Sequence, residues 1–235
     1  MSERGIIALS RLKEMANPEN VEGMARFGIS CANTWGVTMP EIRGLAKELG
    51  KDQELAMELW ESGIHEARIL AGLVAVPALT GEDVMERWVA DFDSWDVCDQ
   101  VVASLFDKTP YAYDLALSWA RREEEFVRRA GFVMMVALAV HDKRAPDQRF
   151  LDFLPIILEG ATDERNFVKK AVNWALRQIG KRNMGLHHAA IEMAREIGSL
   201  DSKSARWIAS DALRELDGEA VRQKVRKVKG EVPGK

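Results

Sequence analysis

The sequence predicts an all-α fold made of many short helices packed side by side. Apolar residues recur with the period of an α-helix along nearly the whole chain, whereas the alternation typical of a β-strand is almost absent. The links between these segments are short and rich in turn residues, as at Thr80-Gly81 and Lys108-Thr109-Pro110. With 47% hydrophobic residues among 235, the chain has enough apolar surface for a sizeable core. This composition excludes disorder for most of its length.

Short links make successive helices antiparallel neighbours. Capping residues mark some boundaries: Thr38 precedes Pro40 and Glu41 at a predicted helix start, and Gly50 ends that helix. In chain order, the predicted helices are 4–15, 18–27, 40–49, 53–61, 65–76, 82–91, 94–106, 111–122, 124–140, 148–158, 164–180, 185–197, 202–216 and 220–227.

A weak internal repeat indicates how the helices are organised. The segment Phe126-Val-Arg-Arg-Ala130 resembles Phe167-Val-Lys-Lys-Ala171, 41 residues further on. A period of about 30–40 residues with two helices per unit is typical of a HEAT-like α-solenoid, which curves and binds partners on its concave face. We therefore expect a curved α-solenoid, one domain over residues 1–228, and a basic flexible tail over 229–235. Because the repeat is blurred, an irregular helical bundle is the competing architecture.

The net charge of −4 hides an uneven distribution. Residues 1–120 carry 10 basic and 20 acidic side chains, and residues 121–235 carry 23 and 17. An acidic protein is a poor partner for nucleic acid, but a basic face on one half can still bind a polyanion.

Several functional classes lack their sequence signals. Cys31 and Cys98 are too few for a disulfide framework or a zinc motif, and His187 and His188 are adjacent and point apart on a helix. There is no phosphate-binding loop, dinucleotide fingerprint or serine nucleophile elbow. We find no signal peptide and no apolar run of the roughly 20 residues that a membrane span needs. We expect a cytoplasmic protein without metal or cofactor.

Trp95 and Asp99 are the most informative pair of candidate site residues. They lie four residues apart at the edge of an apolar helical arc, and Asp99 is too far into the helix to cap it. Asp96 points elsewhere and, with Asp93, is interpreted as part of an N-terminal capping and dipole arrangement. The alternative is that Trp95 is a core aromatic and Asp99 a solvated or ion-paired carboxylate.

A second group of candidates lies in the basic half. Trp174 is off the main apolar stripe of its helix and close in angle to Lys170 and Arg177. It is either a packing residue toward the next repeat or a stacking surface beside phosphate-binding cations. Arg129, which follows Arg128 at the start of an apolar helix, is either a buried salt-bridge partner, for example of an acid from the preceding repeat, or a phosphate anchor.

An ordered set of segments resembles the HEAT-like-repeat DNA glycosylases of the alkylation-repair family. The segments span nearly the whole chain, in the family's order. They are Asn17-Pro-Glu-Asn20, Met24-Ala-Arg-Phe27, Gly36-Val-Thr-Met-Pro-Glu-Ile-Arg43, Glu58-Leu-Trp60, Ser94-Trp-Asp-Val-Cys-Asp99, Arg129-Ala130 and Lys170-Ala-Val-Asn-Trp-Ala-Leu-Arg177.

The resemblance implies excision of purines alkylated at N3 or N7 from duplex DNA, by a monofunctional hydrolase. It implies Asp99, Trp95, Trp174 and Arg129 as catalytic-cleft residues, and lesion capture on an open face without a closed pocket. DNA contacts are expected from Arg128, Lys169, Lys170, Arg177 and Phe27. Some relatives carry tyrosine where this chain has Phe27, which removes a hydroxyl there.

We expect the partner to be duplex DNA containing alkylated bases, with no obligate protein partner, no membrane and a monomeric state. Two alternatives stay open. One is a non-catalytic HEAT-repeat scaffold that binds DNA, and the other is a protein-interaction module anchored by tryptophans. Asp99 argues against a pure DNA scaffold, because its charge repels phosphate.

Overall fold

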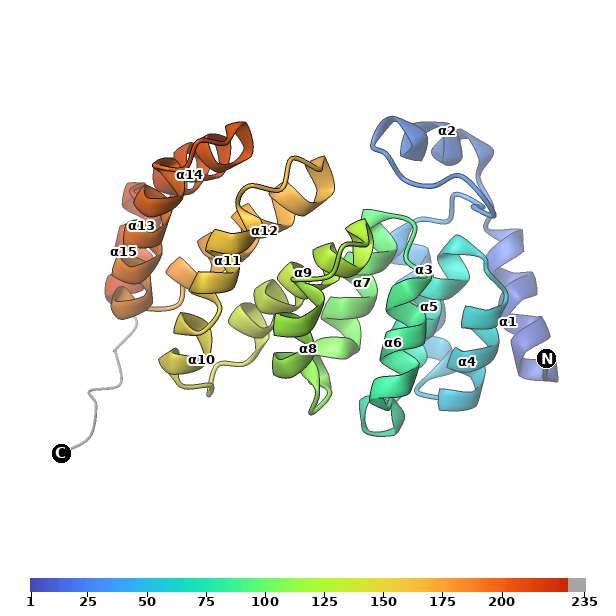
Figure 1. The fold of residues 1–235 in the computed structure, drawn as a ribbon. Coiled ribbons are helices and arrows are strands. Elements are labelled where there is room, and N and C mark those ends of the chain that lie inside the picture. Colours follow the sequence, from blue (N-terminus) through green and yellow to red (C-terminus); the bar gives the residue numbers. More distant parts are fainter. Residues whose placement is uncertain (228–235) are drawn as a thin grey trace. The chain divides into compact units, whose positions relative to one another are not determined.

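The computed structural model describes residues 1–227, which contain fifteen α-helices, two short 3₁₀ turns and no β-strand (Figure 1). The all-α prediction is therefore confirmed for this part of the chain. The predicted basic tail, 229–235, lies outside the described residues. Two compact units are present, Met1–Ala112 and the segment from Tyr113 onward, and each is described by itself. Between residues 1 and 227, no helix is both long and apolar enough to cross a lipid bilayer.

The first unit is a set of helices around an aromatic core. Trp60 and Trp88 stack with parallel rings 4.1 Å apart, and Phe92 and Phe106 pack beside them. Its helices are α1 (Glu3–Glu14), α2 (Pro18–Arg26), α3 (Met39–Leu49), α4 (Gln53–Glu61), α5 (His65–Val74), α6 (Glu82–Ala90) and α7 (Trp95–Ser104), with 3₁₀ turns η1 (Pro77–Leu79) and η2 (Phe106–Lys108).

The described part of the second unit is also built from helices. It contains α8 (Ala112–Trp119), α9 (Glu125–His141), α10 (Asp147–Leu151), α11 (Leu154–Gly160), α12 (Asn166–Gly180), α13 (Met184–Gly198), α14 (Lys203–Leu216) and α15 (Glu219–Lys227). The run from Ala130 to Ala139 in α9 is buried throughout, as expected for an inner helix of a repeat stack.

The internal repeat corresponds to real packing. Phe126 on α9 and Phe167 on α12 begin the two similar segments, and their rings lie 5.6 Å apart. The backbone of α9 also comes very close to the end of α8. An added Cβ on Gly131 would lie only 2.3 Å from the backbone nitrogen of Ala120, the residue that follows α8. Equivalent positions of successive repeats therefore contact each other, which is the geometry that the 41-residue spacing predicts.

One predicted helix is wrong in its extent. The expected helix over 148–158 is two helices, α10 and α11, with a break at Asp152-Phe153. Pro155 is in the first turn of α11, where its missing N–H does not matter, whereas in the middle of one continuous helix it would remove a hydrogen bond and clash with the preceding turn.

Candidate nucleic-acid interface

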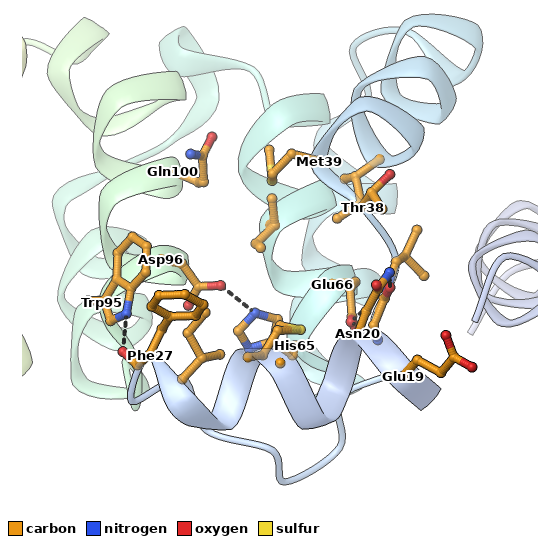
Figure 2. Close-up of a pocket in the computed structure, with 17 residues that line it drawn as sticks. Glu19, Asn20, Phe27, Thr38, Met39, His65, Glu66, Trp95, Asp96 and Gln100 are labelled. Carbon is orange, nitrogen blue, oxygen red and sulfur yellow. Dashed lines mark hydrogen bonds and ion pairs between the residues drawn. The ribbon is translucent and has the colours of Figure 1, made fainter. Parts of the chain in front are cut away.

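An apolar pocket of about 620 Å³ lies in the first unit (Figure 2). Residues from α2, α3, α5 and α7 line it, together with the segment that joins α2 to α3. The lining residues are Glu19, Asn20, Gly23, Met24, Phe27, Ile29, Gly36, Val37, Thr38, Met39, Ile42, His65, Glu66, Ile69, Trp95, Asp96 and Gln100. Trp95 therefore lies beside a pocket, and lesion capture on an open face stays a prediction.

A buried ion pair lies in the pocket wall. The Nε2 atom of His65, on α5, is 2.8 Å from Oδ2 of Asp96, on the first turn of α7 (Figure 2). An ionised carboxylate only accepts, so Nε2–H is the donor. Burial alone would lower the pKa of His65, which is 4% exposed, but the hydrogen bond and the charge of Asp96 outweigh it and raise the pKa. Burial likewise tends to raise the pKa of Asp96, and His65 lowers it overall.

This pair corrects the interpretation of Asp96. Its side chain does more than cap the N-terminus of α7. Oδ2 contacts His65 on another helix, and Oδ1 accepts a hydrogen bond of 2.7 Å from the Ser94 hydroxyl. The aspartate lines the same pocket as its neighbour Trp95. Sequence position alone could not show this, since the helical wheel leaves open which helix faces each side of α7.

Trp95 connects α7 to the end of α2. Its indole Nε1–H donates to the backbone carbonyl of Phe27 at 3.1 Å (Figure 2). The Phe27 side chain is 70% exposed. Asp99 lies one turn further along α7 and, like Trp95, is half-buried. The structure therefore brings Phe27, Trp95 and Asp99 into one region of the first unit.

The segment that joins α2 to α3 is held by a buried carboxylate. Glu66, 1% exposed, accepts backbone N–H bonds from Trp35 at 3.0 Å, from Gly36 at 2.6 Å and from Val37 at 3.3 Å. Gly36 has φ of +76°, and a Cβ there would lie 2.1 Å from the Asn17 carbonyl oxygen. These contacts fix the pocket wall that faces α5.

In the second unit, the two arginines at the start of α9 contact the following repeat. Arg129 is only 5% exposed and donates through Nη1 to the Phe167 carbonyl at 2.6 Å. Arg128 is half-buried, with Nη1 3.4 Å from a carboxylate oxygen of Asp163. Arg129 is thus buried against a backbone carbonyl of the following repeat.

Trp174, Lys170 and Arg177 share α12 but differ in their surroundings. Trp174 is half-buried and Lys170 is exposed. Arg177 forms ion pairs with Asp211 and Glu215 on α14. Burial tends to raise the pKa of Glu215, but its hydrogen bond with Lys181 and the charge of Arg177 lower the pKa overall.

Lys169 lies beside an aromatic residue that the sequence analysis did not select. Its Nζ atom is 5.2 Å from the ring centroid of Trp207 on α14. Trp207 is 41% exposed. The exposure of Trp207 depends on how α12 and α14 pack, which the sequence pattern does not give.

Sequence reasoning thus missed His65, Asp96, Glu66 and Trp207. In the sequence, His65-Glu66 lacks the second histidine that would complete a zinc motif. No group of three or more potential ligands that could hold a metal ion occurs among the described residues. Phe27, Trp95 and Asp99 belong to the first unit, and the remaining predicted site residues belong to the second.

Comparisons with known proteins agree on the type of fold. Residues 8–216 match the family described as DNA alkylation repair enzyme. An uncharacterized protein, Lin0241, of Listeria innocua serovar 6a is 25% identical over 196 residues, which are 81% of this chain and 85% of that protein. A solved structure matches with a TM-score of 0.77 and 22% identity, over 96% of both chains. It is described as a new family of proteins related to the HEAT-like repeat DNA glycosylases with affinity for branched DNA structures. The predicted HEAT-like repeat fold is confirmed.

Proposed function

Since this chain belongs to the DNA alkylation repair enzyme family, we propose that it hydrolyses the N-glycosidic bond of cationic N3- or N7-alkylated purines in duplex DNA. The observation that carries the proposal is that Trp95 and Asp99 lie one turn apart on α7 and are both half-buried, and that Trp95 lines an apolar pocket. The proposal is supported by the partial exposure of both side chains, because a purely structural pair in a core would be fully buried.

The chemistry of the substrate matches these residue types. Alkylation at N3 or N7 gives the purine a fixed positive charge, and a tryptophan face attracts a cation by about 0.5–2 kcal/mol. When the bond from C1′ to the base nitrogen breaks, the base leaves as a neutral molecule with the bonding electron pair. The sugar then carries the positive charge.

Asp99 would act on that charge. A carboxylate beside the sugar stabilises the developing oxocarbenium ion and orients the attacking water. The water oxygen bonds to C1′, and its proton passes to the carboxylate or to solvent. No lysine is placed as a Schiff-base nucleophile in the sequence pattern, so the reaction would end at the abasic sugar.

The second unit would supply contacts to the DNA backbone. Lys170 is exposed and Lys169 is half-buried, so both are proposed phosphate contacts. Trp174, one helical turn after Lys170, is proposed to face the lesion strand. Arg129 is buried against the Phe167 carbonyl, and Arg177 is ion-paired, so in this proposal both hold α12 in place.

The test is release of free base from DNA containing 7-methylguanine or 3-methyladenine. We expect the wild type to release base without cutting the strand, and Asp99→Asn to slow single-turnover release by about 10²-fold or more, the typical effect of losing one preorganised charge-stabilising group. Chromatography of the released base measures both rates.

Asp83→Asn is the matched control. Asp83 is exposed in the first turn of α6, so this variant makes the same change of charge away from α7. Its rate should equal that of the wild type. No release by the wild type, or equal release by Asp99→Asn, would contradict the proposal.

A second candidate is a DNA-binding protein without base-releasing activity. The solved structure with a TM-score of 0.77 belongs to a protein family described by its affinity for branched DNA structures. If that property carries over, the chain would bind forked DNA more tightly than blunt duplex and release no base from methylated DNA. Both measurements use the same protein preparations, so they separate the two candidates.

A further inference from the structure

Three positions along α12 face three positions along α14 at a constant spacing of 38 residues. Asn173 Nδ2 donates to Asp211 Oδ2 at 2.7 Å, and Arg177 pairs with Glu215. Lys169 and Trp207 form the third pair, in which the lysine lies over the indole ring. In two pairs, therefore, the polar or basic residue of α12 meets a carboxylate of α14, and in the third it meets an aromatic ring.

This difference leaves positive charge at the third pair, Lys169 and Trp207. No carboxylate pairs with the Lys169 ammonium anywhere between residues 1 and 227, although Arg177 has two carboxylates within 4 Å. Lys203 is exposed one helical turn before Trp207, and therefore on the same side of α14. The indole itself is 41% exposed. An exposed aromatic ring thus lies beside the Lys169 ammonium, with a second lysine one turn away on its own helix.

We propose that Lys169, Lys203 and Trp207 form a nucleotide-binding site for an unpaired residue of a DNA strand, in which the base stacks on Trp207 and the lysines contact its phosphates. Every base has a flat π face that can stack on an aromatic side chain, and cations beside the ring suit the backbone. The bases of an intact duplex are already stacked on each other. The site would therefore favour single strands, frayed ends and forks over blunt duplex.

A protein partner is the less suitable occupant for this surface. Lysine is depleted in protein–protein interfaces, where buried aromatic anchors are surrounded by apolar or well-paired neighbours. Two lysines beside one half-exposed indole instead match the alternation of phosphate and base in a nucleic-acid strand.

The site rests on the proposed DNA binding but not on catalysis. The experiment measures dissociation constants for an oligonucleotide as a single strand, as a fork and as a blunt duplex. We expect Trp207→Ala to weaken single-strand and fork binding about fivefold to 100-fold, the range found for removing one stacking aromatic. Blunt-duplex binding should change less than twofold, and Trp207→Phe should retain most of the affinity.

Two further variants separate stacking from general electrostatics. Lys169→Gln and Arg214→Gln remove the same charge, but the Arg214 guanidinium is paired with Asp211 on its own helix. We expect Lys169→Gln to weaken single-strand binding more than Arg214→Gln does. Equal effects of the two would mean that only net charge matters and would overturn the assignment.

A spectroscopic measurement tests the stacking directly. The difference in tryptophan fluorescence between wild type and Trp207→Phe reports on Trp207, and stacking of a base should quench it at saturating single-stranded DNA. An unchanged difference with bound DNA would overturn the site while leaving the proposed glycosylase intact. Absence of base release, with Trp207 still quenched, would overturn the glycosylase and leave the site intact.

Discussion

At the scale of single residues, the buried pair of His65 and Asp96 makes the first unit sensitive to pH. Asp96 lies next to Trp95 in the sequence, and both line the pocket. The charges of Glu66 and Asp93 add to that of Asp96 in raising the pKa of His65 against the effect of burial. The protonated imidazole is therefore stabilised by the fold.

The pH dependence of stability follows from this direction. Because the folded-state pKa of His65 lies above the unfolded value of about 6.5, its contribution is fully present below pH 6.5 and is lost as the pH rises through the folded-state pKa. We expect the unfolding free energy of the wild type to fall across this window. In His65→Gln, which keeps a neutral donor, that part of the pH dependence should disappear.

Near-ultraviolet circular dichroism of the stacked Trp60–Trp88 pair reports on unfolding of the first unit. His188→Gln, an exposed histidine of the second unit, is the control and should behave like the wild type. An identical pH dependence in His65→Gln and wild type would contradict the role of the pair.

At the scale of elements, the segment from Ile29 to Thr38 depends on one side chain of α5. Three of its backbone N–H groups donate to Glu66, which also lines the pocket. The uncharged amide of Glu66→Gln offers a single acceptor oxygen, so some of these donors would be buried without a partner. We expect this variant to lose about 2–3 kcal/mol of unfolding free energy, the cost of losing hydrogen bonds to a buried charge.

Urea denaturation measures that loss, and hydrogen exchange locates it. Amides of Trp35, Gly36 and Val37 should exchange faster in Glu66→Gln. The control Glu61→Gln makes the same chemical change at an exposed position of α4 and should leave both measurements unchanged. Protection that persists at these three amides would show that the segment is held by other contacts.

At the scale of the whole molecule, the charge available for DNA is smaller than the count of basic residues. Residues 113–235 carry 23 basic and 18 acidic side chains, whereas residues 1–112 carry 10 and 19. Many cations of the second unit are already paired: Arg128 and Arg165 with Asp163, and Arg177 and Lys181 with Glu215. Only the remaining cations can bind phosphates, and so release counterions from DNA, without breaking an ion pair within the protein.

Salt dependence of duplex binding distinguishes the two classes of cation. Each phosphate contact contributes about 0.9 to the slope of log affinity against log salt concentration. We expect Lys170→Gln to reduce the slope by about 1, as for one lost phosphate contact. Arg177→Gln, a matched change on the same helix, should leave the slope nearly unchanged. Equal slopes in the two variants would contradict this division.

The helical class, most helix boundaries and the spacing of equivalent repeat positions could be predicted from the sequence. These features depend on local information: apolar periodicity, caps such as Thr38 with Glu41, and breaks at glycine or proline. The family resemblance on Trp95, Asp99 and Lys170 could also be read from order along the chain. The split of the expected helix over 148–158 shows the limit of this information, because one proline changed the outcome.

The contacts between polar side chains could not be predicted without knowing how the helices pack. His65 and Asp96 are 31 residues apart, and the contacts between α12 and α14 join residues 38 apart. Helical periodicity gives the direction of a side chain on its own helix but not the neighbour that it faces. The structure therefore shows that Asp96 forms an ion pair with His65 and is not only part of a capping arrangement. It also shows that Arg177 is ion-paired. Trp207 is exposed beside Lys169. Burial and pairing could not be predicted from the sequence, because both depend on how the helices pack.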